Sequence, residues 1–148
     1  MDFPSQHLHP KQKERIAIVS GTLQVSIEGD ERTLTEGEEI TIPPNTTHRH
    51  WNATSHPVRV VWERHPPFRT KEWAESAYVI AQAGHADEEG TPHWLQLAVL
   101  VDEYPDESAY LPVLPVGIQK LLFSLLAPIG SLVGYEATHS RNDSATPQ

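Results

Sequence analysis

Two short stretches of the chain carry side chains of the kind that bind first-row transition metals. Residues 7–21, HLHPKQKERIAIVSG, contain a His-x-His pair followed by a glutamate, and residues 37–52, GEEITIPPNTTHRHWN, contain a further histidine. Three imidazoles and one carboxylate suit Fe(II), Mn(II), Ni(II), Co(II) or Zn(II), and the ligand set ranks none of these ions above the others. It leaves two positions of an octahedral ion open for water, O2 or a substrate. We therefore predict a divalent transition-metal site with these ligands: His7, His9, Glu14 and His48.

The spacing of these residues agrees with strands that present them to one interior. His7 and His9 are two residues apart, so in a strand both side chains project to the same side. Glu14 opens the next strand after a tight connection, and its carboxylate can fold back onto that face. His48 must come from a strand that crosses the fold, and His50 shares its parity and should also point inward. His50 is then either a general acid or base beside the metal or a core histidine bonded to a backbone carbonyl.

The strands that must position these side chains are visible as short alternating segments. Apolar residues recur at every second position in segments 16–19, 23–27, 40–42 and 58–63. Turn residues separate them at 28–31 and 35–38, and Pro43-Pro44 cannot continue a ladder. Short strands at this spacing predict a mainly β sandwich or barrel.

The pattern becomes helical after Pro67. Apolar residues at helical spacing predict a helix over residues 71–83 and another that Thr91-Pro92 begins and Tyr104 ends. A third apolar run, residues 116–133, should be broken at Pro128. Its uninterrupted part is shorter than the ~20 residues of a membrane span, so we expect a core or dimer-interface helix.

Bulk composition excludes several classes of function. The net charge of −9 disfavours nucleic acid and anionic membrane surfaces, because phosphate binding needs clustered lysine and arginine. The absence of cysteine excludes disulfides and thiolate metal sites. The start, MDFPSQ, lacks the basic and apolar regions of a secretory signal, and cytoplasmic residence is expected.

The two motifs resemble those of the cupin superfamily, in particular its small single-domain members of the cupin 2 type. Asn45 stands where the second motif normally has glycine, and asparagine also tolerates left-handed backbone angles. The matching positions are His7, His9, Glu14 and Gly21 in the first motif and Gly37, Pro43, His48 and Asn52 in the second.

The resemblance implies a mainly β fold, a double-stranded β-helix (jelly-roll) barrel with two or three C-terminal helices. We expect a barrel domain over residues 1–67, a helical extension over 68–137 packed on the barrel or on a partner, and a flexible tail over 138–148. Only six residues precede His7, so we expect the barrel to lack N-terminal strands.

The resemblance also sets the functional expectations. A barrel-bound divalent metal would act on or hold a small organic molecule, as in dioxygenases of the quercetinase type, with Glu14 as ligand and proton acceptor. His50 is the second candidate catalytic residue. The alternatives are a binding or sensing module without turnover and a sugar-isomerase-type or cyclase enzyme, so enzymatic activity is left open. Cupins are often dimers, which predicts a homodimer.

Overall fold

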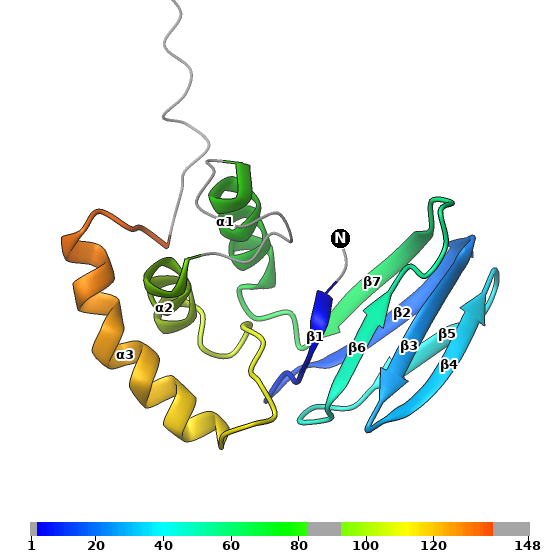
Figure 1. The fold of residues 1–148 in the computed structure, drawn as a ribbon, viewed down its shortest axis with the longest axis horizontal. Coiled ribbons are helices and arrows are strands. Elements are labelled where there is room, and N and C mark those ends of the chain that lie inside the picture. Colours follow the sequence, from blue (N-terminus) through cyan, green and yellow to red (C-terminus); the bar gives the residue numbers. More distant parts are fainter. Residues whose placement is uncertain (1–2, 83–92, 138–148) are drawn as a thin grey trace, which may run out of the picture.

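The computed structural model describes residues 3–82 and 93–137. Within these residues the chain forms seven strands followed by three helices (Figure 1). Their bounds are β1 (Phe3–His7), β2 (Lys13–Ser20), β3 (Thr22–Ile27), β4 (Asp30–Thr35), β5 (Glu39–Ile42), β6 (His48–Trp51), β7 (Arg59–His65), α1 (Thr70–Gln82), α2 (Trp94–Glu103) and α3 (Val116–Leu132).

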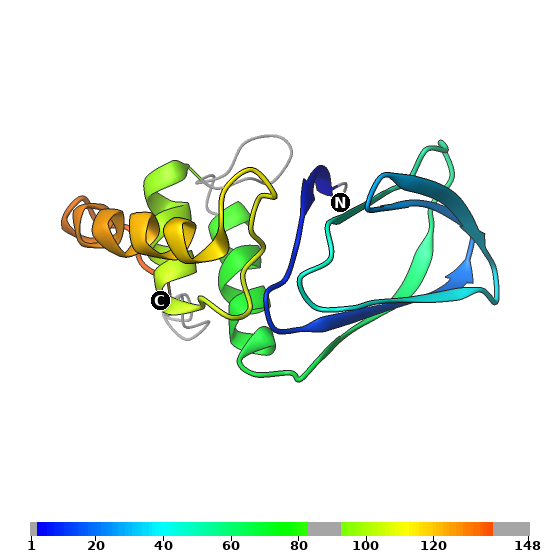
Figure 2. The same ribbon diagram turned by 90° about the horizontal axis from the view of Figure 1, so that it is seen from below.

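The strands form two facing antiparallel sheets, with the orders β1-β6-β3-β4 and β5-β2-β7 (Figures 1 and 2). Alternating residues of both sheets point into one apolar core, as the period-two pattern predicts. This confirms the predicted cupin-type β fold followed by C-terminal helices. The core residues are Ile16, Ile18, Leu23, Val25, Leu34, Ile40 and Ile42.

β4 was not predicted as a strand, since of its six residues only Leu34 is buried. A strand this polar gives no clear alternation in the sequence. Its pairing with β3, from Thr22 opposite Thr35 to Ile27 opposite Asp30, forms a hairpin that a single inward leucine ties to the core.

The register of β6 brings the two motifs together. His48 lies opposite His7 of β1 on one side and opposite Ile27 of β3 on the other. The turn before β6 is tied to the first motif as well, because the Asn45 N–H donates to the His9 carbonyl at 2.7 Å. Asn45 has φ of 60°, so the expected left-handed turn is present without a glycine.

The helices form a separate layer beside the edge strands β1 and β7, and α3 lies farthest from the barrel (Figures 1 and 2). α1 matches its predicted range closely, and Ile80 in its last turn is fully buried. α2 begins at Trp94 with His93 as N-cap, whereas Thr91 and Pro92, predicted to begin it, lie outside the described residues. In the predicted apolar stripe of α2, Ala98, Val101 and Tyr104 are buried and Leu97 is partly buried. Trp94, in the first turn, is 55% exposed.

The expected break at Pro128 is wrong, because α3 continues from Val116 to Leu132 with this proline inside it. A proline removes one N–H from the helix, but packing can hold the turns on both sides. Ala127 and Gly130 flank Pro128 and are buried in α3. Gly130 has no space for a side chain, since a Cβ there would lie 2.6 Å from Val99 of α2. Contact with α2 therefore fixes the last turns of the helix.

Among the described residues, no helix is long and apolar enough to cross a membrane. The predicted tail over residues 138–148 and the loop after α1 lie outside the described residues.

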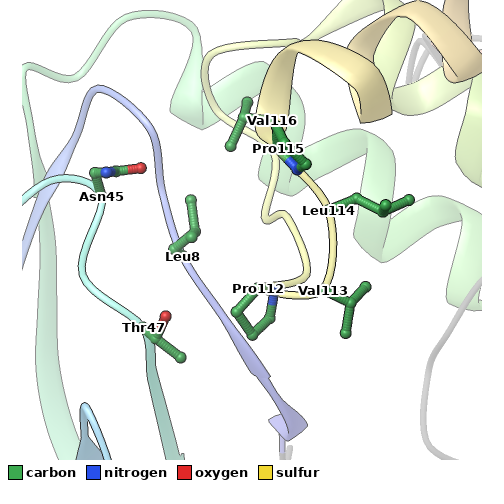
Figure 3. A pocket seen from close by; sticks show the side chains of 8 residues that line it. All are labelled: Leu8, Asn45, Thr47, Pro112, Val113, Leu114, Pro115 and Val116. Carbon is green, nitrogen blue, oxygen red and sulfur yellow. The ribbon is translucent and has the colours of Figure 1, made fainter.

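The segment between α2 and α3 joins the helices to the barrel. Leu8 and Tyr110 form a two-hydrogen-bond bridge, with N···O distances of 2.9 and 3.0 Å. Asp106 accepts from Lys11 of the barrel at 2.9 Å and from Lys120 of α3 at 2.8 Å. A pocket of about 300 Å³ lies beside this junction, lined by Leu8, the turn at 45–47 and residues 112–116 (Figure 3). No titratable side chain lines this pocket.

The motif glycines allow a matched test of the turns. Gly21 and Gly37 both have positive φ, of 86° and 85°. A Cβ on Gly21 would lie 2.8 Å from the Pro57 carbonyl oxygen, whereas a Cβ on Gly37 would meet nothing within 4 Å. We expect Gly37→Ala to cost about 1–2 kcal/mol for the backbone angle alone. Gly21→Ala should cost more, and equal losses in urea unfolding would contradict the close contact at Gly21.

Candidate metal centre

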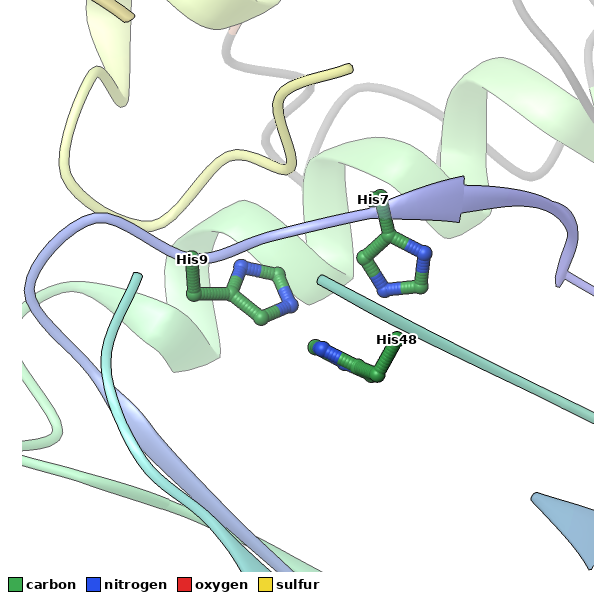
Figure 4. Close-up of side chains that lie close together, drawn as sticks. All are labelled: His7, His9 and His48. Carbon is green, nitrogen blue, oxygen red and sulfur yellow. The ribbon is translucent and has the colours of Figure 1, made fainter. Parts of the chain in front are cut away.

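Three of the predicted ligands form one buried cluster (Figure 4). His7 ends β1, His9 follows two residues later, and His48 begins β6, and none of the three is more than 5% exposed. Their candidate ligand atoms all lie within 4.8 Å of one another. The centroids of the His7 and His48 rings are 4.4 Å apart. The cluster is thus consistent with a metal site and leaves the identity of the ion open.

Backbone carbonyls orient two of these rings. Nδ1 of His48 lies 2.9 Å from the Thr46 carbonyl oxygen, and Nδ1 of His9 lies 3.4 Å from that of Ser108. A carbonyl can only accept, so each Nδ1 carries the hydrogen and donates it. The other nitrogen, Nε2, then keeps its lone pair for a metal. Such outer hydrogen bonds commonly fix the tautomer of a metal-binding histidine.

Glu14, in β2, brings a carboxylate to the same place. Its Oε2 lies 3.3 Å from Nε2 of His9, and its Oε1 lies 3.7 Å from Nε2 of His48. Neighbouring ligands on one ion, each bonded at ~2.1 Å, are about 3.0–3.4 Å apart. Glu14 is 1% exposed, and burial raises its pKa. The adjacent His48 and His9 and the Arg64 guanidinium lower that pKa by more, so the carboxyl group is ionised at neutral pH.

Buried atoms without partners support the fit of a cation at this place. Nε2 of His9, Nε2 of His48 and both carboxylate oxygens of Glu14 are buried and form no hydrogen bond. Leaving a buried polar atom unpaired costs about 1–3 kcal/mol, and more for a charged one. These atoms converge from three different segments. A divalent ion would use the lone pairs of all of them together.

Arg64, in β7, is a residue of the site that the sequence analysis missed. Its Nε lies 3.7 Å from Oε2 of Glu14, and its Nη1 donates to the Glu107 carbonyl at 2.8 Å. The guanidinium is stacked between Trp62 and Trp73, 4.4 and 4.8 Å from the ring centroids. Burial lowers the pKa of Arg64 to about 10, so the group remains charged at neutral pH. The alternation of side chains along a strand could have identified Arg64, because Arg64 and Trp62 are two residues apart and lie on the same face of β7.

His50 and Asn52, which share the strand parity of His48, differ in their surroundings. His50 lies beside the cluster, with Nε2 3.7 Å from Oε1 of Glu14, and burial lowers its pKa. The Asn52 side chain belongs to the following turn, where it accepts from Thr54 N–H at 3.0 Å and donates to the His56 carbonyl at 2.7 Å. The second motif thus ends in a turn-forming asparagine.

The segment before α3 closes the site from the helical side. Through their carbonyls, Glu107 contacts Arg64 and Ser108 contacts His9, and both residues are buried. The Glu107 carboxylate also accepts from the Arg69 backbone N–H at 2.8 Å. Backbone carbonyls carry no sequence signature, so nothing in the sequence could have assigned this segment to the site.

Comparison with known proteins agrees with the fold. Residues 2–63 match the family model of the cupin domain. This range contains all four predicted ligands and the strands that carry them. Residues 2–63 are therefore a cupin domain.

The relatives match only part of the chain. An oxidoreductase of Arthrobotrys oligospora is 43% identical over 49 residues, which are 32% of this chain and 19% of that protein. A cupin protein of Bacteroides fragilis is 24% identical, over 43% of this chain and 53% of that one, with a TM-score of 0.40. A sugar phosphate isomerase of Silicibacter pomeroyi is 25% identical, over 44% of each chain, with a TM-score of 0.38. The chain thus spans about half of these structures and a fifth of the oxidoreductase.

The buried histidines predict how stability depends on pH. Burial lowers the pKa of His9 and of His50, so the unfolded chain takes up protons near pH 6.5 while the folded chain resists them. Their contribution to stability is therefore full above pH 6.5 and is lost as the pH falls. We expect metal-free protein to lose up to about 1.4 kcal/mol per pH unit for each histidine below that pH.

Urea unfolding at a series of pH values measures this effect. His50→Gln should reduce the slope below pH 6.5, and substitution of the exposed His56 by Gln serves as the control. A free energy of unfolding that stays constant from about pH 8 to about pH 5 would contradict buried neutral imidazoles.

Proposed function

We propose that the protein is a metal-dependent enzyme of the dioxygenase type, which acts on a small organic molecule at a divalent transition metal. The metal is held by His7, His9, Glu14 and His48. The observation that carries the proposal is the convergence of buried, unpartnered ligand atoms of His9, Glu14 and His48 on one point. The oxidoreductase name of the relative that is 43% identical over 49 residues agrees with this class of reaction.

The charges around the site indicate the kind of ligand it takes. Arg64 and Glu14 are oppositely charged neighbours, 3.7 Å apart. The buried Glu107 adds a negative charge near Arg64. With neutral histidines, a divalent ion leaves one net positive charge in a buried place. Buried charge needs compensation, so the preferred ligand is a monoanion with a carboxylate, enolate or phenolate oxygen.

The residues of the site have separate roles in the proposed reaction. A metal held by His7, His9, Glu14 and His48 would supply Lewis acidity toward a substrate oxygen and O2. Glu14 accepts the proton when the substrate O–H bond breaks, and the resulting oxyanion lies within the field of Arg64. His50, 3.7 Å from the Glu14 carboxylate, then passes the proton toward solvent. The segment at Glu107 and Ser108 shields this side of the site from water.

A second candidate is an isomerase of the sugar-isomerase type or a cyclase. The pair of Glu14 and His50 favours it, because two groups that differ in basicity and lie 3.7 Å apart can move a proton between two substrate atoms. Such a reaction needs no O2. A third possibility is a module that binds a small molecule without turnover, which the same site would support.

Metal content tests the ligand assignment. We expect the wild-type protein to retain one equivalent of Fe(II), Mn(II), Co(II), Ni(II) or Zn(II) after gel filtration, measured by plasma emission. His48→Ala should lose at least nine tenths of it, whereas His56→Ala, at an exposed turn, should lose none. Metal should also leave in mild acid, because imidazole must be neutral to bind. Full metal content in His48→Ala, or in the wild type down to about pH 4, would contradict the site.

Oxygen consumption tests the reaction class. We expect the metal-loaded protein to consume O2 with flavonols or other enols, and His48→Ala treated in the same way to consume none. An oxygen electrode and the Fe(II), Mn(II) and Ni(II) series are sufficient for the measurement. Exchange of substrate C–H for deuterium without oxygen uptake would favour the isomerase. If the protein binds the small molecule but catalyses neither reaction, the third possibility is favoured, a binding module without turnover.

A further inference from the structure

α3 is apolar over most of its circumference, and a stripe of Lys120, Ser124 and Ser131 interrupts it. The fold buries only one of its apolar sides. Phe123, Ala127 and Gly130 face the helical core, where Gly130 lies directly against Val99 of α2. The apolar face of a helix in a globular protein is normally buried. The face of α3 that points away from α2 is instead open, at the far edge of the molecule (Figure 1).

The open face has the spacing of a helix–helix seam. Its central residues recur at intervals of four and three along the 17-residue helix. This is the repeat by which two helices pack side by side, with alternate residues of each filling gaps in the other. Each of these side chains is between 46% and 87% exposed: Ile118, Leu122, Leu125, Ile129 and Leu132.

The two longer segments outside the described residues lack the side chains that could cover this seam. Residues 83–92, AGHADEEGTP, and residues 138–148, THSRNDSATPQ, contain no large apolar side chain. Neither of these two segments can supply an apolar cover for the seam.

A membrane surface and a charged partner fit poorly. Helices that lie on membranes carry lysine and arginine beside the apolar face. The single charged residue of α3 is Lys120, which is bound to Asp106. The chain as a whole has a net charge of −9, which opposes anionic lipid. The seam needs an uncharged apolar helix with the same repeat, and α3 of a second copy is such a helix.

We propose that α3 pairs with α3 of a second copy of this chain across a two-fold axis, with Leu125 at the axis. Leu125 is the middle residue of the seam, so it meets its own counterpart whether the two helices run parallel or antiparallel. The seam supplies five side chains, and Leu121, Val133, Val113 and Leu114 extend it. A standard stable interface uses ~20–30 residues a side. The interface is therefore small, and the dimer dissociates on dilution.

Sedimentation over a wide concentration series tests the pairing with metal-free protein, so the result does not depend on the proposed reaction. We expect the mass to rise with concentration from 16.6 kDa to twice that value. Leu125→Glu should remain at 16.6 kDa throughout. Ser131→Glu adds the same charge to an exposed position of α3 outside the seam, and it should behave as the wild type. Because Leu125 is 64% exposed, its substitution should leave the circular dichroism and melting temperature unchanged.

A cysteine placed on the axis gives a second measurement, because the chain has no cysteine of its own. Oxidation of Leu125→Cys should give a covalent dimer, whereas Tyr78→Cys, on α1 and 58% exposed, should stay monomeric. A monomer at every concentration would overturn the proposal. So would a dimer that Leu125→Glu does not dissociate, or the absence of a cross-link at position 125. Co-sedimentation of the wild type, but not Leu125→Glu, with phosphatidylcholine vesicles would assign the face to lipid instead.

Discussion

The structure is arranged around one ionised carboxylate that is almost completely removed from water. Glu14 is 1% exposed, and both of its oxygens lack hydrogen bonds. Burying a charge costs several kcal/mol unless other charges and donors compensate it. The surrounding residues share this task, since Arg64 approaches one oxygen and the imidazoles of His9 and His48 lie within 3.7 Å. A bound cation would complete the compensation. The two sheets thus hold these side chains in an arrangement that is consistent with a metal site.

The helical layer takes part in this arrangement. The edge strands β1 and β7 of the barrel face the helices, and the segment between α2 and α3 contacts residues next to or within them (Figure 2). That segment orients His9 through the Ser108 carbonyl and holds Arg64 through the Glu107 carbonyl. The helices therefore supply outer contacts of the site as well as a cover for the barrel. Loosening the bridge between Leu8 and Tyr110 would disturb His9, because Leu8 is its neighbour in the chain.

The features predicted from the sequence are those that depend on parity and on motif spacing. Period-two alternation identified most of the strands and placed His7, His9 and Glu14 on one interior face. The chemistry of the donor set predicted a metal site, and the buried cluster of His7, His9 and His48 is consistent with it. Arg64 followed the same parity, but an arginine in an apolar strand is easily assigned to the surface because isolated charges are seldom buried.

Two further features depend on contacts that leave no trace in the sequence. The role of Ser108 rests on its backbone carbonyl, which every residue possesses. The continuity of α3 through Pro128 rests on the packing of Gly130 against α2, a contact between residues far apart in the chain. Local propensity predicts a break there, and tertiary packing overrides it.

The centre of the barrel and the outer face of α3 present opposite problems of solvation. In the barrel, polar atoms of His9, Glu14 and His48 are buried without hydrogen bonds, and a bound cation would compensate for them. On α3, apolar side chains are exposed to water, and a partner surface would bury them. α2 and the segment that follows it connect the two places, since α2 packs on α3 through Val99 and the segment reaches His9 through Ser108.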